Sequence, residues 1–347
     1  MPEKKYDVVI VGGGISGALL ANKLARKNKS VLLLDAGPDV GLSKGSELEY
    51  AESYQDYLDR FYTQAAKVPN SPYENNPFAP QSNVLDINKI NPPNPDTAGY
   101  FVQYGPLPFS STNTRALGGT TLHWLGICLR MLPNDFNMRS SYGYGVDWPI
   151  DYKDLKGYYE EAELEIGVSA NVEDLRYPGT DDDYFGNFEY PKGYKKKGAR
   201  KNKGKYIFPM HKIPPSYFDQ YLSKRIKGMK FQDGKEKVDI DVVSIPQGRN
   251  SDPNYDYFDP RTGYRYHPQG AVGTNHEGER CEGNSNCIPI CPVQAKYNAN
   301  KTLSNALSIE NTSVTLQPRS VVSKLNIDPD TGNITGVEYK EYVKAGD

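Results

Sequence analysis

A glycine-rich turn near the N-terminus constrains the fold of this chain more than any other feature. Residues 6–11 have the composition of a buried strand, and Gly12-Gly13-Gly14-Ile15-Ser16-Gly17 follows them directly. The pattern predicts a helix from this turn to Asn28 and a second strand over residues 31–34, which ends at Asp35. This βαβ order predicts an α/β chain that contains a Rossmann-like dinucleotide-binding domain.

Three of these glycines, Gly12, Gly14 and Gly17, match G-x-G-x-x-G. In that pattern the first glycine allows the tight turn, the second lets the backbone approach a pyrophosphate, and the third lets the helix pack on the strand. The helix N-terminus, with Ser16, supplies free N–H groups to the phosphates. Asp35, followed by Ala36, is predicted to accept hydrogen bonds from ribose hydroxyls.

FAD and NAD both satisfy this signature, so a more distant segment has to decide between them. An NAD-binding domain normally continues with alternating strands and helices. Here the chain turns irregular after Gly37 and is rich in Tyr, Pro and Asn from about residue 40 to 110. We take that interruption to favour FAD.

A second glycine pair lies in residues 113–124, Asn-Thr-Arg-Ala-Leu-Gly-Gly-Thr-Thr-Leu-His-Trp. Its polar side chains are of the kind that can approach an isoalloxazine and its phosphates. The candidate cofactor residues in this segment are Arg115, Gly118, Gly119, Thr120 and His123.

With this segment the chain resembles the glucose-methanol-choline (GMC) flavoprotein oxidoreductases. Members have a similar N-terminal G-x-G-x-x-G, an acid-Ala-Gly after the second strand and an Arg-x-Leu-Gly-Gly-Ser/Thr segment beside the flavin. The resemblance implies a Rossmann-like FAD-binding domain with an interleaved, loop-rich substrate-binding domain. The expected division is 1–45 (FAD-binding), 46–104 (irregular insertion), 105–140 (FAD-binding), 141–279 (substrate side) and 280–347 (cysteine loop and return to the FAD-binding domain).

The resemblance also implies roles for single residues. Several members bond a histidine at the position of His123 covalently to the flavin 8α carbon, and a histidine that only hydrogen-bonds near the cofactor is the alternative. Val322 matches a valine whose backbone contacts adenine. Trp124, and residues 147–150 before a predicted helix at 151–166, resemble the pyranose oxidase and membrane-linked sugar dehydrogenase branch.

Three cysteines, Cys281, Cys287 and Cys291, form C-x5-C-x3-C-P in a loop rich in Gly, Asn and Pro. Such thiols suit an iron–sulfur cluster, and three of them suggest 3Fe-4S or a cubane with one ligand from outside the loop. A zinc site with His276 and a disulfide between Cys281 and Cys287 are the alternatives. The bacterial FAD-dependent glucose, gluconate and fructose dehydrogenase catalytic subunits carry a similar loop, so the resemblance implies the cluster.

The fourth cysteine, Cys128, lies among apolar residues and is predicted to be a small buried hydrophobe. The whole chain of 347 residues has 41 Lys and Arg against 43 Asp and Glu, a net charge of −2, which excludes a bulk attraction to nucleic acid. No apolar run approaches the ~20 residues of a membrane-spanning helix. No export signal precedes the first strand, so we expect a cytoplasmic protein, or a periplasmic one exported with a signal-bearing partner.

The function that these features predict is an FAD-dependent oxidoreductase acting on CH–OH groups of a sugar, polyol or sugar acid. Electrons are expected to leave through the 3Fe-4S cluster to a cytochrome c or a quinone, and a small export or chaperone subunit is a further expected partner. A pyranose-oxidase-like enzyme that uses oxygen and a non-catalytic electron-transfer module are the alternatives. No histidine follows His276, so the catalytic pair of the family is expected beyond residue 347, and no catalytic residue is assigned.

Overall fold

The fold is seen in a computed structural model that describes residues 5–37, 39, 117–122, 124–175, 182–185, 206–234, 236–270, 280–281, 283, 291 and 293–341. Its centre is a parallel sheet of strands β1 (Val8–Val11), β2 (Val31–Leu34) and β5 (Val314–Gln317), in the order β1-β2-β5. Val31 of β2 pairs with Val8 on one side and with Val314 on the other. A strand from near the end of the sequence therefore extends the sheet that the N-terminus begins.

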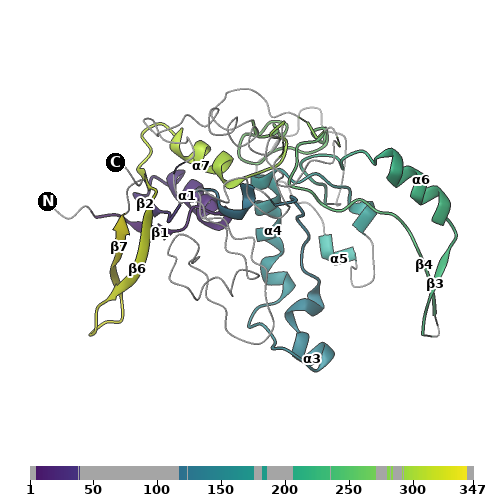
Figure 1. Cartoon of the computed structure of the whole chain (residues 1–347), viewed down its shortest axis with the longest axis horizontal. Helices are drawn as coiled ribbons and strands as arrows, with labels where there is room; N and C mark the ends of the chain where they lie inside the picture. Colours follow the sequence, from purple (N-terminus) through teal and green to yellow (C-terminus); the bar gives the residue numbers. More distant parts are fainter. Residues whose placement is uncertain are drawn as a thin grey trace, which may run out of the picture.

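Helix α1 (Ile15–Ala25) covers one face of this sheet, and helix α7 (Ala299–Leu307) packs beside α1 (Figure 1). Alanines at the buried positions of α1 allow that close approach. In β1 only Ile10 is buried, while Val9 and Val11 are exposed, as a strand covered on one face requires. The core between these elements consists of Ile10, Ala18, Ala21, Val31, Leu33, Leu117, Ala299 and Leu303.

A second core forms around α4 (Tyr152–Ile166). This helix begins at a capping box between Asp151 and Asp154 and ends at Gly167, which has a φ of 75°. It confirms the helix predicted for residues 151–166. The core beside it is unusually aromatic and consists of Phe136, Tyr152, Val168, Ala170, Leu175, Tyr184, Phe185, Tyr206 and Phe208.

This aromatic core encloses an ion pair. Arg130 donates to both carboxylate oxygens of Glu163, at 2.6 Å and 2.7 Å, and to the hydroxyl of Tyr152 at 3.0 Å. Its guanidinium also lies over the ring of Tyr206, 4.7 Å from the centroid. Both charged side chains are at most 5% exposed, so the pair is buried and fully hydrogen-bonded.

Two projections extend from the body in Figure 1. One consists of α6 (Tyr217–Ile226) and the hairpin of β3 (Lys230–Asp233) and β4 (Glu236–Asp239), and the other is the antiparallel hairpin of β6 (Ser320–Ile327) and β7 (Ile334–Glu341). The short remaining elements are η2 (Gly119–Leu122), η3 (Pro133–Phe136), α3 (Met138–Tyr142), η4 (Val172–Leu175) and α5 (Asp182–Phe185).

The predicted class is confirmed: the chain is α/β with a Rossmann-like domain, and the loop-rich second part lies between β2 and β5 in the sequence. Several predictions fall outside the described residues, namely the irregular region from 40 to 110, Arg115, His123, His276 and Cys287. Within the part of the chain that the structure describes, no helix has the length and apolar character needed to cross a bilayer.

Candidate cofactor-binding edge and cysteine turn

The three parallel strands end at one edge of the sheet, and backbone hydrogen bonds join the turns that follow them. Gly12 N donates to Leu34 O at 2.7 Å, directly after β1 and β2. Asp35 N donates to Gln317 O, at the end of β5, at 3.0 Å. The carboxyl edge of an open parallel sheet is where such folds bind ligands.

Helix α1 starts at this edge without a side-chain cap from the described residues. Gly14 is its N-cap, in an extended conformation, and no side chain caps the helix. The first turn contains no acidic residue, and Ser16 within it is exposed. The first N–H groups of a helix have no partner inside it, and they carry the positive end of its dipole. This terminus therefore suits a phosphate.

Gly17 allows α1 to pack directly against the glycine turn. A Cβ at this position would lie 1.9 Å from Gly12 O and 3.3 Å from Ile10 Cγ2. Because the nearest of these atoms belongs to the backbone of the turn and cannot rotate away, any larger residue at position 17 forces the helix away from the turn. Glycine is thus needed here for close packing, which is the role that the motif predicts for it.

The second glycine segment lies directly beside the first. The Leu117 side chain is fully buried against Gly13, and a Cβ built on Gly119 would lie 3.7 Å from the Cα of Gly14. Gly118 has a φ of 97°, and a Cβ there would come within 2.7 Å of Asn300 Oδ1. The structure therefore brings Gly118 to Thr120 next to the N-terminus of α1, although the irregular region from about 40 to 110 lies between the two motifs in the sequence.

This second segment is anchored to the start of α7. Ala299 N donates to Thr121 Oγ1 at 2.9 Å, Asn300 Nδ2 donates to Leu117 O at 3.2 Å, and Trp124 Nε1 donates to Tyr297 O at 2.8 Å. These bonds attach the residues on both sides of position 123 to the start of α7 and to Tyr297 just before it.

Two buried amide oxygens beside this anchor have no hydrogen-bond partner among the residues that the structure describes. They are Oδ1 of Asn298 and Oδ1 of Asn300, in residues that are 8% and 0% exposed. A buried acceptor without a donor costs free energy. Donors from a bound cofactor or an ordered water would satisfy them, so the site fits an additional polar group.

Asp35 uses its carboxylate on the protein backbone. Gly13 N donates to Oδ2 and Gly37 N donates to Oδ1, both at 2.6 Å. The side chain thereby fixes the turns after β1 and β2 relative to each other. The predicted bond from Asp35 to a ribose hydroxyl stays a prediction.

Val322 lies close to the same edge. Arg319 N donates to Gly37 O at 2.8 Å, and Ser320 N donates to Asp35 O at 2.7 Å. Strand β6 therefore starts beside Asp35 and Ala36, and the half-buried Val322 follows two residues later, paired with Tyr339. The predicted contact of Val322 with adenine stays a prediction.

The two described cysteines of the cluster motif lie on adjoining backbone segments. Cys281 N donates to Asn250 O at 3.0 Å, and Asn250 N in turn donates to Ala295 O at 2.8 Å. Cys291 begins a turn in which Gln294 N donates to Cys291 O at 3.1 Å. Both are thiols rather than disulfides, so the disulfide alternative gains no support. Among the described residues no three potential ligands converge, and Cys287 is not one of those residues.

Two buried lysines in this region have no local signal in the sequence. Lys296 is 4% exposed and donates from Nζ to Trp124 O at 2.5 Å. Lys301 is 3% exposed and donates from Nζ to Gln294 O at 2.6 Å. Burial lowers the pKa of Lys301 to about 8, and the charge of Cys291 opposes that shift. Lysines in a polar stretch normally predict a solvated surface, which is why the pattern missed them.

Cys128 lies apart from these groups and packs against the aromatic core. Burial raises the pKa of its thiol to about 12. A thiol that stays protonated is neither a nucleophile nor a metal ligand. This environment agrees with the prediction that Cys128 is a small buried hydrophobe.

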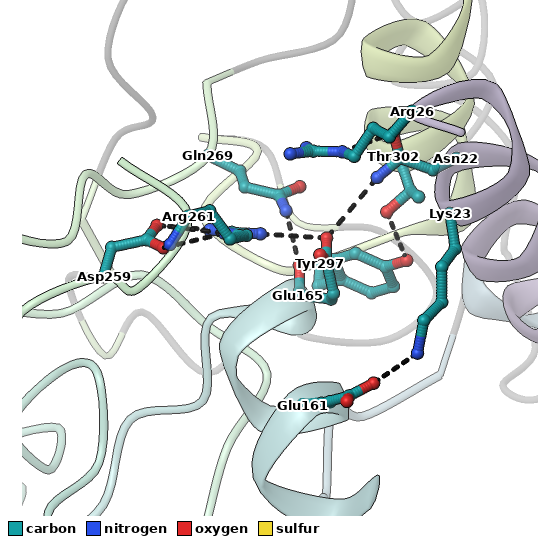
Figure 2. A network of polar contacts seen from close by, with 10 residues as sticks. All are labelled: Asn22, Lys23, Arg26, Glu161, Glu165, Asp259, Arg261, Gln269, Tyr297 and Thr302. Carbon is teal, nitrogen blue, oxygen red and sulfur yellow. Dashed lines mark hydrogen bonds and ion pairs between the residues drawn. The ribbon is translucent and has the colours of Figure 1, made fainter. Parts of the chain in front are cut away.

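A polar network joins the Rossmann-like unit to the second core (Figure 2). The buried Asn22 of α1 donates from Nδ2 to Glu165 Oε2 at 3.4 Å, and Arg261 pairs with the same oxygen at 2.9 Å. Arg261 also pairs with Asp259 at 2.6 Å, and Gln269 Nε2 donates to the backbone oxygen of Glu165 at 2.5 Å. The end of α4 is thereby fixed to α1, and hence to the cofactor edge.

A cavity of about 600 Å³ lies elsewhere, between α6 and residues 242–249. Its polar lining includes Lys212, Asp219, Lys224 and Arg249. None of the predicted cofactor residues lines it, so it is separate from the edge of the sheet.

Comparison with known proteins places this geometry in a family. The family described as NAD(P)-binding Rossmann-like domain matches residues 10–57. The fructose dehydrogenase large subunit of Gluconobacter japonicus is 31% identical over 336 residues, which is 96% of this chain and 48% of that protein. These similarities support a GMC-type flavoprotein. The chain spans about half the length of that relative.

Other GMC-type similarities are weaker. The gluconate 2-dehydrogenase flavoprotein of Pantoea cypripedii is 26% identical over 201 residues, 54% of this chain and 29% of that protein. A crystal structure of formate oxidase aligns with 97% of this chain and 42% of its own, at 14% identity and a TM-score of 0.42.

Proposed function

We propose that this chain is the FAD-binding part of an oxidoreductase that oxidises CH–OH groups of a sugar, polyol or sugar acid. One observation carries the proposal: the two glycine segments meet at the carboxyl edge of the sheet, where Gly119 lies against Gly14 at the start of α1. The similarity to the fructose dehydrogenase large subunit supports the same class of substrate.

On this proposal, different residues of the edge bind different parts of the cofactor. The amides at Gly14, Ser16 and Gly17 bind the pyrophosphate, because they are the unpaired start of a helix without an acidic first turn. Asp35, with Ala36, lies beside the ribose. Val322 contacts the adenine on this proposal, because it follows two residues after Ser320, which bonds to Asp35 O.

The flavin end lies at the second glycine segment. Gly118, Gly119 and Thr120 supply backbone close to α1, and Arg115 and His123 belong to the same segment. When bound, FAD supplies the two-electron acceptor for hydride from the substrate carbinol. The protein's own contribution, on this proposal, is to orient that acceptor through Thr121 and Asn300, which tie the segment to α7.

For onward transfer we propose a 3Fe-4S cluster bound by Cys281, Cys287 and Cys291. The donor chemistry fits, because all three ligands are cysteine thiols. A one-electron centre suits a cytochrome or quinone acceptor. A small export or chaperone subunit is a further proposed partner. The protein is periplasmic if it is exported together with that subunit, and otherwise cytoplasmic.

The test of the flavin assignment is an anaerobic mixing experiment on the full-length protein. We expect extractable FAD in stoichiometric amount, and loss of its visible absorbance on mixing with at least one of a panel of aldoses, ketoses, polyols and sugar acids. Bleaching by none of them supports the non-catalytic module instead. Steady peroxide production with substrate, in iron-free protein, supports the oxidase alternative.

The covalent bond at His123 has a separate test. Acid precipitation of the wild type should leave the yellow colour with the protein, and His123→Ala should release it to the supernatant. Wild-type colour wholly in the supernatant contradicts the bond and leaves hydrogen bonding as the role of His123.

The cluster is tested by metal analysis. Iron and acid-labile sulfide should both be present in the purified wild type, and both should be lost in Cys287→Ser. Zinc without iron would overturn the cluster in favour of a zinc site.

A further inference from the structure

Lys301 is a buried cation that the function described so far does not use. It lies in the first turn of α7 and is 3% exposed, and its neighbours Asn300 and Thr302 are fully buried. Placing an ammonium in the interior costs several kcal/mol unless an opposite charge and hydrogen bonds compensate. A residue in such a position therefore indicates an anion close by.

The described residues supply a hydrogen bond for Lys301 but no carboxylate. Its Nζ donates to the backbone oxygen of Gln294 at 2.6 Å. No ion pair joins it to an aspartate or glutamate within the described ranges. The acidic group whose charge acts on Lys301 is Cys291.

The backbone fixes this relationship. Gln294 N donates to Cys291 O at 3.1 Å, which closes a turn, and the carbonyl of the same Gln294 accepts from Nζ of Lys301. The ammonium is thus attached to the turn that presents Cys291. The adjacent Asn300 donates to Leu117 O, so the start of α7 contacts the cysteine turn and the flavin-side glycine segment together.

We propose that Lys301 is the positive charge that balances the anionic sulfur-bound centre at Cys291, and that it raises the reduction potential of that centre. The inference rests on the proposed cluster. Thiolate-held clusters gain negative charge when they accept an electron, and their potentials depend on net charge, hydrogen bonding and exposure. A buried cation bonded to the turn that presents one ligand favours the reduced form, because little solvent screens it.

The experiment separates the effect of the charge at position 301 from the effect of side-chain shape, in the FAD-loaded, full-length protein. Lys301→Met removes the charge and keeps the length of the side chain, while Lys301→Arg keeps the charge. Lys27→Met removes a charge from an exposed position on the loop after α1 and is the control. Iron, sulfide and FAD content are measured for each, and the midpoint potential of the cluster is measured by redox titration followed by electron paramagnetic resonance.

We expect Lys301→Met to shift the one-electron reduction equilibrium at least tenfold toward the oxidised form, about 59 mV, or to lose iron while it keeps FAD. Lys27→Met should match the wild type, and Lys301→Arg should keep both its iron and a potential close to wild type. If Lys301→Met loses FAD as well, Lys301→Gln is used as the neutral variant instead, because its amide can still donate to Gln294 O. The same changes in potential and iron content are expected for it.

Two results overturn the inference. The first is an unchanged potential and iron content in the neutral variant. The second is equal loss of iron from Lys301→Met and Lys301→Arg with FAD retained, which would mean that packing and not charge is needed. Iron-free wild-type protein is a different result, because it refutes the proposed cluster itself.

Discussion

Replacing Gly17 with alanine tests whether α1 must lie directly on the glycine turn to bind the cofactor. The added Cβ would stand 1.9 Å from Gly12 O and 3.1 Å from the Gly12 carbonyl carbon. Ordinary van der Waals contact starts near 3.4 Å. The helix start therefore has to retreat by roughly 1.5 Å, because the atoms it meets are backbone that cannot rotate away.

The balance of effects at Gly17 is unfavourable. Alanine in a helix interior gains about 0.5–1 kcal/mol over glycine. Forcing extra volume into a close-packed contact costs about 1–3 kcal/mol. A retreat of this size also breaks hydrogen bonds to a bound pyrophosphate, and one charge-assisted bond is worth about 1.5–3 kcal/mol. We therefore expect FAD affinity to fall at least about tenfold, with a smaller loss of stability.

Gly157 offers a matched control on the same type of element. It lies in the middle of α4, is exposed, and a Cβ there meets nothing within 4 Å. Gly157→Ala should stabilise the protein by about 0.5–1 kcal/mol and leave FAD binding unchanged. The assays are urea unfolding for stability, and FAD content with reconstitution titrations for affinity. Full FAD affinity in Gly17→Ala, together with unfolding like that of Gly157→Ala, would refute the close-packing argument.

Two further predictions concern the second core. Arg130→Met leaves Glu163 buried without its partner and should cost about 3–5 kcal/mol in urea unfolding, whereas Lys23→Met, which removes an exposed ion pair with Glu161, should cost less than about 1 kcal/mol. Equal losses would contradict the burial argument. At about pH 8 iodoacetamide should leave Cys128 unlabelled in the native protein and label it in urea, because burial raises the pKa of its thiol to about 12 and keeps it protonated; rapid native labelling, detected by mass spectrometry, would count against that environment.

Local patterns were sufficient to predict several of the elements, among them β1, α1, β2 and α4. The run of apolar residues before Gly12 predicts β1, and the glycine spacing predicts where α1 begins. At α4, Asp151 and Asp154 form the capping box that marks its start, and Gly167 ends it. Each of these signals acts between residues within a few positions of one another, so the sequence displays them directly.

Long-range contacts carry no comparable signal. Nothing near residues 314–317 indicates that this strand pairs with β2, or that Leu117 packs on Gly13. The burial of Lys301 is likewise set by the elements around α7 and not by its own neighbours in sequence, which are polar. Asp35 was predicted to face a ribose, and only the structure reveals that it also binds the amides of Gly13 and Gly37.

The order of strands in the sheet has a consequence for how the protein is made. Strand β2 gains its second neighbour only when β5 leaves the ribosome, after the whole of the aromatic core has been synthesised. Until then the nascent chain presents an open strand edge, the kind of surface on which other chains aggregate. Contacts between such distant segments also form slowly. Biogenesis of this protein, including flavin loading, should therefore depend on protection of that edge during translation.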